Sequence, residues 1–309
     1  MTGPNITVMT PSPPDRPRIG HAPPAPALRA FVERYWWCEG GAGALPRLLP
    51  GTGAELWTHW AGGVVPRAAD TAADTAGGTG APTPLPAAHL VCLRRAAWRL
   101  ERRAGASGFL AVRFRAGALR HLVPFGLDEL ADRVVAAEDL WGASGRRLVE
   151  QVRAAGGPAQ RLALMDSFLT GRLAEHHRPE PWLEAAVGRV YRRPNGLRID
   201  RLAASTGVGT RRLQRAFPAA VGARPKEFQR LARFQRLTRR LLLEDQRDYL
   251  PAALAAGYYD QAHFVHEFRR LTGERPTALL GRGLSHFSYP PLTLGGDAAR
   301  ELPRRTETP

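Results

Sequence analysis

The chain has 309 residues, of which 44% are apolar, and carries a formal net charge of +16. This length suffices for two domains with a core each, and the charge favours a polyanionic partner such as nucleic acid, with a solvated basic surface as the alternative. Cys38 and Cys92 are the only cysteines, too few for a disulfide framework or a four-cysteine zinc site, so we expect both to be reduced and buried. The start of the chain does not have the pattern of a signal peptide, and an apolar run of about 18 residues is missing, so we expect a cytoplasmic protein with no membrane partner.

In the first third of the chain, the sequence predicts a disordered, proline-rich tail that is followed by β-strands. Residues 1–27 are rich in proline, which disfavours a helix or an interior strand, so we expect a disordered tail. Aromatic and partly alternating segments predict strands, and the Thr/Ala/Gly/Pro segment 70–86 predicts a mobile loop. The strands are expected at residues 31–38, 54–60, 89–95 and 109–114.

The next segments have helical periodicity. Apolar residues three and four apart predict helices over 127–137, 144–155 and 158–174, with Asp128 and Ser144 as N-caps of the first two. Strands followed by helices indicate an α+β first domain, which we assign to 28–178. A further helix over 182–191 leads into a second, all-α domain at 179–282, and residues 283–309 are expected to be a flexible tail.

The second domain contains one supersecondary unit twice. Ala203 and Gly207 recur as Ala253 and Gly257, 50 residues on, whereas the later landmarks recur 51 residues on, so the second copy has one extra residue just after its turn glycine. These later landmarks are Leu213, Phe217, Gly222 and Pro225 in the first copy and Phe264, Phe268, Gly273 and Pro276 in the second. A small residue at the helix crossing and a glycine in the turn are what a helix-turn-helix unit needs.

Spacing defines the outward face of the second helix in each copy. In the first copy, Arg211, Gln214 and Arg215 lie at i, i+3 and i+4 and point outward together. Arginine pairs with guanine and glutamine with adenine, so this face is suited to reading bases in a major groove. The alternative is an ordinary solvated helix face. The same positions of the second copy are chemically poorer, with Asp260 as the N-cap; the base-reading residues expected there are Gln261, Ala262, Val265 and His266.

The charge of the chain is concentrated on this repeat. Residues 189–282 hold 20 lysine and arginine residues against 8 acidic residues. We therefore expect phosphate contacts beside the base-reading residues. The candidates are Thr210, Arg212, Lys226, His263, Arg269 and Arg270.

An amphipathic helix is predicted between the two copies. Residues 226–243 contain no proline and carry an apolar stripe. A helix of this length spans about 27 Å, which would separate the two reading helices by a distance comparable with one turn of B-DNA, roughly 34 Å. A single chain would then read two successive segments of major groove.

Residues 199–280 resemble the DNA-binding domain of AraC/XylS-type transcriptional regulators. The segments Gly257–Phe264 and Phe268–Thr277 are most similar to that family. The resemblance implies two helix-turn-helix subdomains, joined by a long helix, that bind double-stranded promoter DNA. It also implies a bacterial, nucleoid-associated transcription factor, an activator or a repressor, that contacts RNA polymerase. His266 stands where the family often has arginine.

The first domain resembles, less specifically, the sensory domains of the same family. Segments 34–37, 49–51, 113–118 and 139–142 carry this resemblance. It implies a β-rich, sometimes cupin-like portion, helices that form a homodimer, and a small-molecule effector. Aromatic residues on strands are more often core residues than ligand contacts. The candidate effector-pocket residues are Trp36, Trp37, Trp57, Trp60, Arg113 and Phe114.

Two other classes of function stay open at this point. A non-specific architectural DNA binder would also carry the net charge and the poor second face. An enzyme with catalysis in the first domain is the more remote alternative, because residues 28–175 contain no metal-ligand spacing, phosphate-binding loop or nucleophile elbow. We therefore predict no catalytic residue, no metal and no cofactor.

Overall fold

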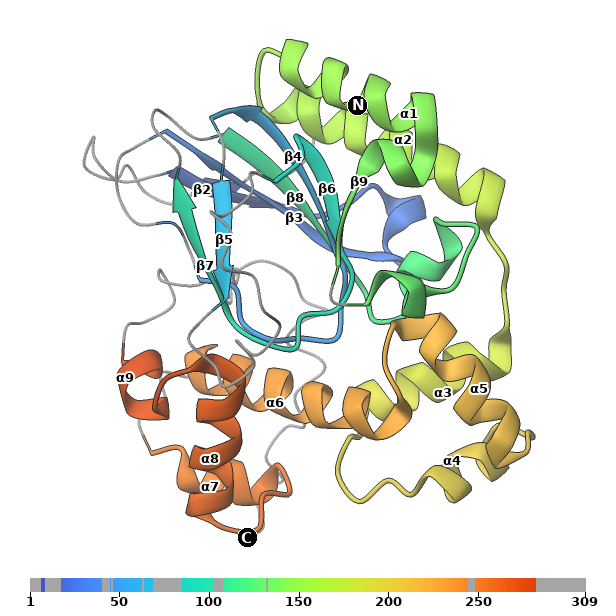
Figure 1. Cartoon of the computed structure of the whole chain (residues 1–309), viewed down its shortest axis with the longest axis vertical. Helices are drawn as coiled ribbons and strands as arrows, with labels where there is room; N and C mark the ends of the chain where they lie inside the picture. The colour runs from blue at the N-terminus through green and yellow to red at the C-terminus, as the bar shows by residue number, and fades with distance from the viewer. Residues whose placement is uncertain are drawn as a thin grey trace, which may run out of the picture.

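The computed structural model describes residues 7–8, 18–40, 45, 47–62, 64–68, 85–102, 108–131, 133–243 and 248–281. Within these residues a β-rich domain lies directly above an all-helical domain (Figure 1). The predicted α+β first domain and all-α second domain are confirmed. No helix in the described part of the chain is both long enough and apolar enough to cross a bilayer.

The first domain is built on a seven-stranded antiparallel sheet. Its strand order is β1-β2-β3-β8-β4-β6-β9, and β5 pairs with β7 in a separate two-stranded sheet. The strands are β1 Thr7–Val8, β2 Arg18–Ala22, β3 Val32–Glu39, β4 Glu55–Ala61, β5 Val64–Ala68, β6 Ala88–Val91, β7 Trp98–Arg102, β8 Gly108–Phe114 and β9 Val134–Ala136. Buried residues on β3, β4 and β8 give the sheet a core on both faces.

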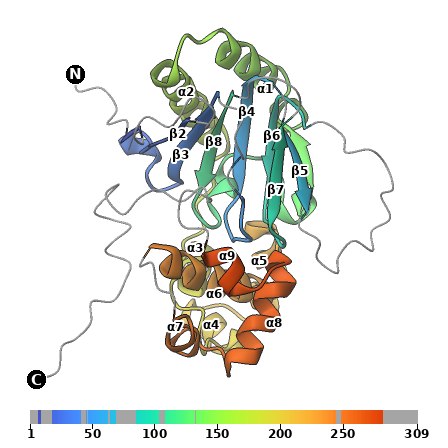
Figure 2. The ribbon, with the colours of Figure 1, turned by 90° about the vertical axis from the view of Figure 1, so that its left-hand side faces the viewer.

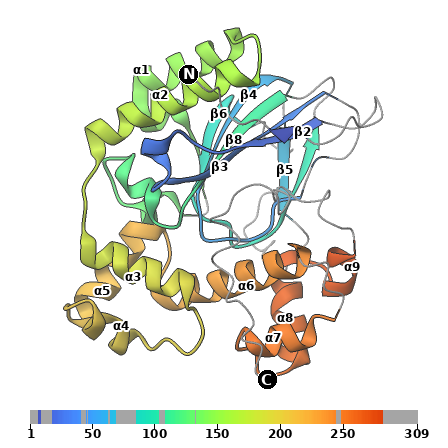
Figure 3. The same ribbon diagram turned by 180° about the vertical axis from the view of Figure 1, so that it is seen from behind.

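Helices cover one end of this sheet. Helix α1 (Ala137–Ala154) packs against β4 and β6, and α2 (Pro158–His176) packs against α1. Leu162, Met165 and Leu169 of the predicted stripe are buried. Three short 3-10 helices, η1 (Pro26–Leu28), η2 (Ala118–His121) and η3 (Leu127–Leu130), complete this domain. Figure 3 shows the chain descending from α2 to α3 on the outside of the molecule.

The second domain consists of helices that pack around the long helix α6. It contains α3 Pro181–Arg192, α4 Ile199–Ser205, α5 Thr210–Val221, α6 Pro225–Leu243, α7 Leu250–Ala255, α8 Gln261–Thr272 and α9 Pro276–Leu280. The predicted connecting helix is therefore present, and it starts one residue early because proline is tolerated in a first helical turn. The apolar stripe of α6 is buried at Phe228, Leu231 and Phe234.

Two expectations for the first domain are wrong. Residues 18–22 are not a disordered tail, because β2 pairs with β1 and β3 inside the sheet and buries His21. The proline-rich composition around this strand concealed it. Residues 127–137 are not one helix either. After η3 the chain forms β9, in which Val134 and Val135 pair with β6, a place that suits β-branched residues.

Two helices of the first domain start at other residues than the sequence predicts. Helix α1 begins at Ala137, with Ala136 at the N-cap, and kinks at Gly142, so Ser144 lies inside the helix. Asp128 lies in the first turn of η3 instead of capping an α-helix. Of the segment predicted as a loop, residues 70–84 lie outside the described residues, as do the C-terminal residues 283–309.

Candidate nucleic-acid interface

The first helix-turn-helix unit consists of α4 and α5. Ala203 is buried where the two helices meet, and Gly207 adopts a φ of +70° in the turn. Leu213 and Phe217 of α5 are completely buried. These contacts fix the orientation of α5 on the domain, as the sequence predicts.

The second unit, α7 and α8, repeats the same construction. Ala253 is buried at the crossing, Gly257 has a φ of +82°, and Phe264 and Phe268 are completely buried. The N-cap prediction is confirmed, because the Asp260 carboxylate accepts a hydrogen bond of 2.7 Å from the backbone N–H of His263.

Equivalent backbone hydrogen bonds show which residues of the two units correspond. The N–H of Val208 donates to the carbonyl of Ala203 at 3.1 Å, and the N–H of Tyr258 donates to the carbonyl of Ala253 at 3.1 Å. Gly209 and Asp260 are the two N-caps, so the extra residue of the second unit is Tyr259. Its side chain is 87% exposed. The insertion therefore places an exposed aromatic residue directly before Asp260, the N-cap of α8.

Three polar side chains form the outward face of α5. Arg211, Gln214 and Arg215 are all exposed. Gln214 also lines a hollow of about 350 Å³ together with Ile199, Arg224, Pro225 and Lys226. Two further cations therefore lie beside the base-reading candidates. The arrangement provides hydrogen-bond donors and positive charge together, as a groove-reading helix requires.

The outward face of α8 is less polar. Gln261, Ala262 and His266 are exposed, and Val265 is half-buried. The side-chain amide of Gln261 lies 3.4 Å from the hydroxyl of Tyr249 on the preceding helix. The second face therefore offers one amide, one imidazole and apolar groups to a base edge.

The inward side of the second unit is more polar than that of the first. Glu267 is buried and accepts hydrogen bonds from the Tyr258 hydroxyl at 2.7 Å and from Arg233 of α6 at 3.0 Å. Arg233 also lies over the Tyr258 ring, 4.3 Å from its centroid. Burial and the neighbouring Glu267 raise the pKa of Tyr258 well above its usual value. The equivalent position of Glu267 in the first unit is Ala216.

Most candidate phosphate contacts are exposed. The guanidinium of Arg212 lies over the Trp182 ring, 5.0 Å from its centroid, which ties the first turn of α5 to α3. The Nδ1 atom of His263 accepts from the backbone N–H of Tyr259 at 3.3 Å. The exposed candidates are Arg212, Lys226, His263, Arg269 and Arg270, whereas Thr210 is half-buried.

An arginine of the first domain contacts the C-terminal end of α5, and another contacts the C-terminal end of α8. Arg95 donates to the carbonyl of Gly222 at 3.2 Å and to Glu227 at 2.5 Å. Arg47 donates to the carbonyl of Thr272 at 2.6 Å and pairs with Glu274, which Arg99 also contacts at 2.8 Å. A cation at a helix C-terminus is stabilising because it meets the negative end of the helix dipole.

Helix α6 is attached to the first domain at two further points. The Gln235 side chain accepts from the backbone N–H of Thr52 at 2.8 Å and from its hydroxyl at 3.0 Å. Arg239 lies 3.5 Å from Glu33. Burial alone would raise the pKa of Glu33, but Arg34, Arg239 and Arg113 lower that pKa below its usual value. Glu33 is therefore held ionised at the boundary between the domains.

The structure separates the six candidate effector-pocket residues. Trp36 and Trp57 pack edge to face with ring centroids 5.0 Å apart on one face of the sheet, whereas Trp37 and Phe114 belong to the core on the other face. Consecutive residues of a strand point to opposite faces, so Trp36 and Trp37 cannot share a pocket. Arg113 lies 3.4 Å from the buried Glu55, and Trp60 is stacked under Arg161 at 3.8 Å.

A smaller polar cluster accompanies Trp36 and Trp57. The rings of His59 and His89 stack 5.4 Å apart beside Trp57. Burial lowers the pKa of His59 to about 3 and that of His89 to about 4, so both are neutral at neutral pH. Neither nitrogen of His59 has a hydrogen-bond partner in the part of the chain that the structure describes. Within the same residues, no three His, Cys, Asp or Glu side chains are grouped as metal ligands would be.

Sequence reasoning missed the arginines that hold the reading helices. Arg47 and Arg95 lie in loop and bridge regions and meet their partners more than a hundred residues along the chain. No local pattern marks such a contact. Tyr259 could have been found, because the change in repeat offset from 50 to 51 places one extra residue at this turn.

Three comparisons with known proteins place this chain among others. A family model described as a helix-turn-helix domain matches residues 202–282. The fold is similar to that of ToxT from Vibrio cholerae in its P21 form, with a TM-score of 0.44 and 10% identity over 77% of this chain and 93% of that chain. ToxT from strain SCE256, solved with an unsaturated fatty acid bound, has a TM-score of 0.45 and 10% identity, covering 80% and 92% of the two chains. The comparison with curated proteins found no match.

Proposed function

From the AraC-type helix-turn-helix domain that residues 202–282 form, we propose that the protein is a sequence-specific transcriptional regulator that reads two successive major-groove segments. The observation that supports this most strongly is the pair of reading helices. They have equivalent backbone hydrogen bonds and buried anchors but different outward faces. Both lie on the same side of α6 in Figure 2, so one duplex can contact both.

The chemistry of the two faces suggests how the reading is divided. Arg211 and Arg215 can each donate two hydrogen bonds to guanine, and Gln214 can pair with adenine. On α8, Gln261 can address a base edge and Ala262 or Val265 a thymine methyl group. The first unit therefore supplies most of the sequence choice, and the second supplies a lighter grip together with phosphate contacts.

Selection of binding sequences from random duplex DNA tests this proposal. The full chain should enrich one motif, bound about 10³-fold or more tightly than random competitor DNA at physiological salt. A footprint on that motif should cover two major-groove segments about one helical turn apart, roughly 34 Å. Equal affinity for every sequence would refute the proposal.

The first domain gives this regulator its control. We propose that a small-molecule effector binds it next to Trp36, Trp57 and His59, where the buried His59 imidazole has no hydrogen-bond partner among the described residues. The arginine contacts at the ends of α5 and α8 would pass a change in this domain to the reading helices. Homodimerisation and contact with RNA polymerase on promoter DNA complete the proposed role, in the cytoplasm and on the nucleoid, with no catalytic step.

A non-specific, architectural DNA binder is the second candidate function. The formal charge of +16 and the less polar outward face of α8 favour it. The variant Arg211→Ala separates the two, because loss of discrimination at one base supports readout, whereas a uniform loss with a smaller salt slope supports phosphate binding.

A further inference from the structure

A pocket lined by arginines lies in the helical domain, away from the reading helices. It has a volume of about 350 Å³ and is formed by the end of α3, the second half of α6 and α7. Figure 2 places α3 and α7 on one side of α6, and α5 and α8 on the other. No residue of α5 or α8 lines this pocket. A duplex bound to the reading helices would therefore leave the pocket open.

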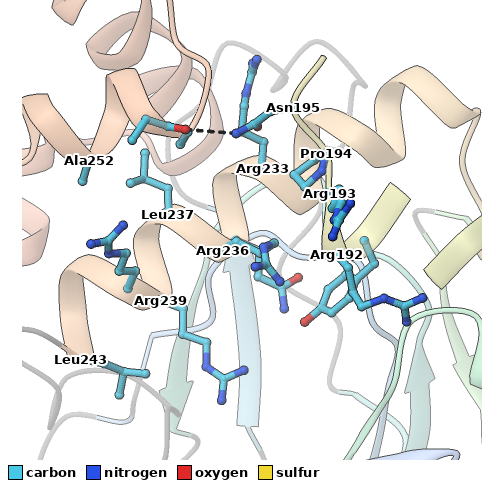
Figure 4. A pocket seen from close by; sticks show the side chains of 15 residues that line it. Arg192, Arg193, Pro194, Asn195, Arg233, Arg236, Leu237, Arg239, Leu243 and Ala252 are labelled. Carbon is cyan, nitrogen blue, oxygen red and sulfur yellow. Dashed lines mark hydrogen bonds between the residues drawn. The ribbon is translucent and has the colours of Figure 1, made fainter. Parts of the chain in front are cut away.

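The charge of the lining is one-sided. Among the residues that the structure describes, fifteen line the pocket, of which six are arginines and none is acidic. The arginines are Arg192, Arg193, Arg233, Arg236, Arg239 and Arg240. Arg233 is compensated by Glu267 and Arg239 by Glu33, both from outside the lining. Arg236 is half-buried near the centre of the pocket (Figure 4) and has no hydrogen-bond or ion-pair partner among the described residues.

Much of the rest of the wall is apolar. Leu237, Leu243 and Ala252 contribute aliphatic surface, and Pro194 is buried. The Asn195 side chain donates to the carbonyl of Ala255 at 3.2 Å, which joins the α3–α4 loop to α7 across the pocket. The volume lies at the lower end of the range for small-ligand sites, about 300–1,000 Å³.

We propose that this pocket binds a small phosphorylated molecule that carries at least two negative charges and a compact apolar group. Guanidinium groups pair with phosphate oxygens through two parallel hydrogen bonds, and several arginines can share one diphosphate. A single carboxylate would carry only one negative charge into a pocket lined by six arginines, two of which are paired with Glu267 and Glu33. The aliphatic wall receives the apolar group of the ligand.

Such a ligand would act on the contact between the domains. Arg239 lines the pocket and also pairs with Glu33 on β3, and Gln235 lines the pocket and also binds Thr52. A phosphate near Arg239 competes with Glu33 for the same guanidinium. The site would therefore report the ligand to the first domain through α6, independently of whether the DNA sequence is read.

Calorimetric titration of the full chain with ADP and with inorganic pyrophosphate tests this site at about 0.15 M salt, where long-range attraction to exposed charge is largely screened. Both probes should bind saturably, with ADP the tighter. Arg236→Ala should lower the affinity for both probes at least tenfold, and Arg192→Ala should also lower the affinity for both. The matched control Arg211→Ala, on the reading face, should change either affinity less than twofold. Circular dichroism and thermal unfolding check that each variant is folded.

Three results would overturn the proposal. One is the absence of saturable binding by either probe, and another is an equal loss in Arg236→Ala and Arg211→Ala, which would indicate attraction to the net charge alone. The third is displacement of ADP by the selected duplex together with equal weakening of DNA binding in Arg236→Ala and Arg211→Ala. That result would make the pocket a contact for the DNA backbone. Retention of ADP in the presence of bound duplex supports a separate site.

Discussion

The two helix-turn-helix units differ most where they are exposed and least where they are buried. Both bury a phenylalanine in the same place, at Phe217 and Phe268, and both end the reading helix at a glycine with a φ of +76°. Their outward residues have little in common. The comparison teaches that equivalent packing holds α5 and α8 in equivalent orientations, while their solvent-facing side chains differ freely between the units.

The two units also differ in part of their interior. In the first unit Val208 and Ala216 occupy the positions that Tyr258 and Glu267 occupy in the second. A network of buried Tyr258, buried Glu267 and half-buried Arg233 therefore replaces apolar packing. The Tyr258 hydroxyl and the Glu267 carboxylate are both hydrogen-bonded, as buried polar groups usually are, whereas the Nε atom of Arg233 has no hydrogen-bond partner among the described residues.

The largest expected effect concerns the shared scaffold. Phe217→Ala and Phe268→Ala should each lower the free energy of unfolding by about 3–5 kcal/mol, because each removes a completely buried ring. Urea denaturation monitored by circular dichroism measures both. Leu254→Ala, at a side chain that is 47% exposed, is the control and should change stability by less than about 0.5 kcal/mol. A loss below about 1 kcal/mol in only one unit would show that the two scaffolds are not equivalent.

The next effect separates the reading faces. Arg211→Ala should cost about 1–3 kcal/mol of discrimination at one base pair, because a bidentate contact to guanine is lost. His266→Ala should cost less than half of that value. Mobility-shift titrations against single-base variants of the selected DNA measure both. Arg146→Ala, an exposed arginine on α1, controls for the loss of one positive charge. If His266→Ala relaxes specificity more than Arg211→Ala does, the assignment of the two faces is wrong.

A smaller effect concerns how the first domain holds the two helices. Arg95→Ala should destabilise the C-terminal turn of α5 by about 1–2 kcal/mol, because the helix end loses its cation. Arg47→Ala should affect α8 less, since Arg99 still contacts Glu274 at 2.8 Å. Hydrogen exchange of the last amides of α5 and α8 measures each effect locally. Unchanged exchange in both variants would mean that these arginines do not stabilise the helix ends.

The smallest effect concerns the start of each reading helix. Asp260→Ala should cost about 1 kcal/mol, because the carboxylate no longer accepts from the His263 N–H. Gly209→Asp should instead stabilise the first unit by a few tenths of a kcal/mol, since glycine caps almost as well as a polar residue. The Gly209 φ of −71° allows any side chain. Thermal unfolding compares the two variants, and a stabilising Asp260→Ala change would contradict the capping account.

The helical domain was largely predictable from the sequence because its information is local. Glycine turns, buried residues four apart and the Asp260 cap lie within one unit, and their repetition reinforced each of them. The sheet was less predictable. Strand β2 is held by pairing with β1 and β3, and β9 by pairing with β6. Pairing across long stretches of chain has no signature in the composition of either partner.

The candidate site shows the same division. Exposure of Arg211, Gln214 and Arg215 followed from helical spacing alone. The six candidate effector-pocket residues do not line one pocket, because strand alternation places Trp36 and Trp37 on opposite faces of the sheet. The contacts of Arg47 and Arg95 depend on how two domains meet, which spacing along the chain does not encode.

The central claim is that the first unit reads the sequence and the second mainly holds the DNA. It is tested most directly by measuring the affinity of the full chain for its selected duplex after the base pairs under α5, and separately those under α8, have been scrambled. The account predicts a clearly larger loss of affinity for the segment under α5. An equal loss, or a larger loss for the segment under α8, would contradict it.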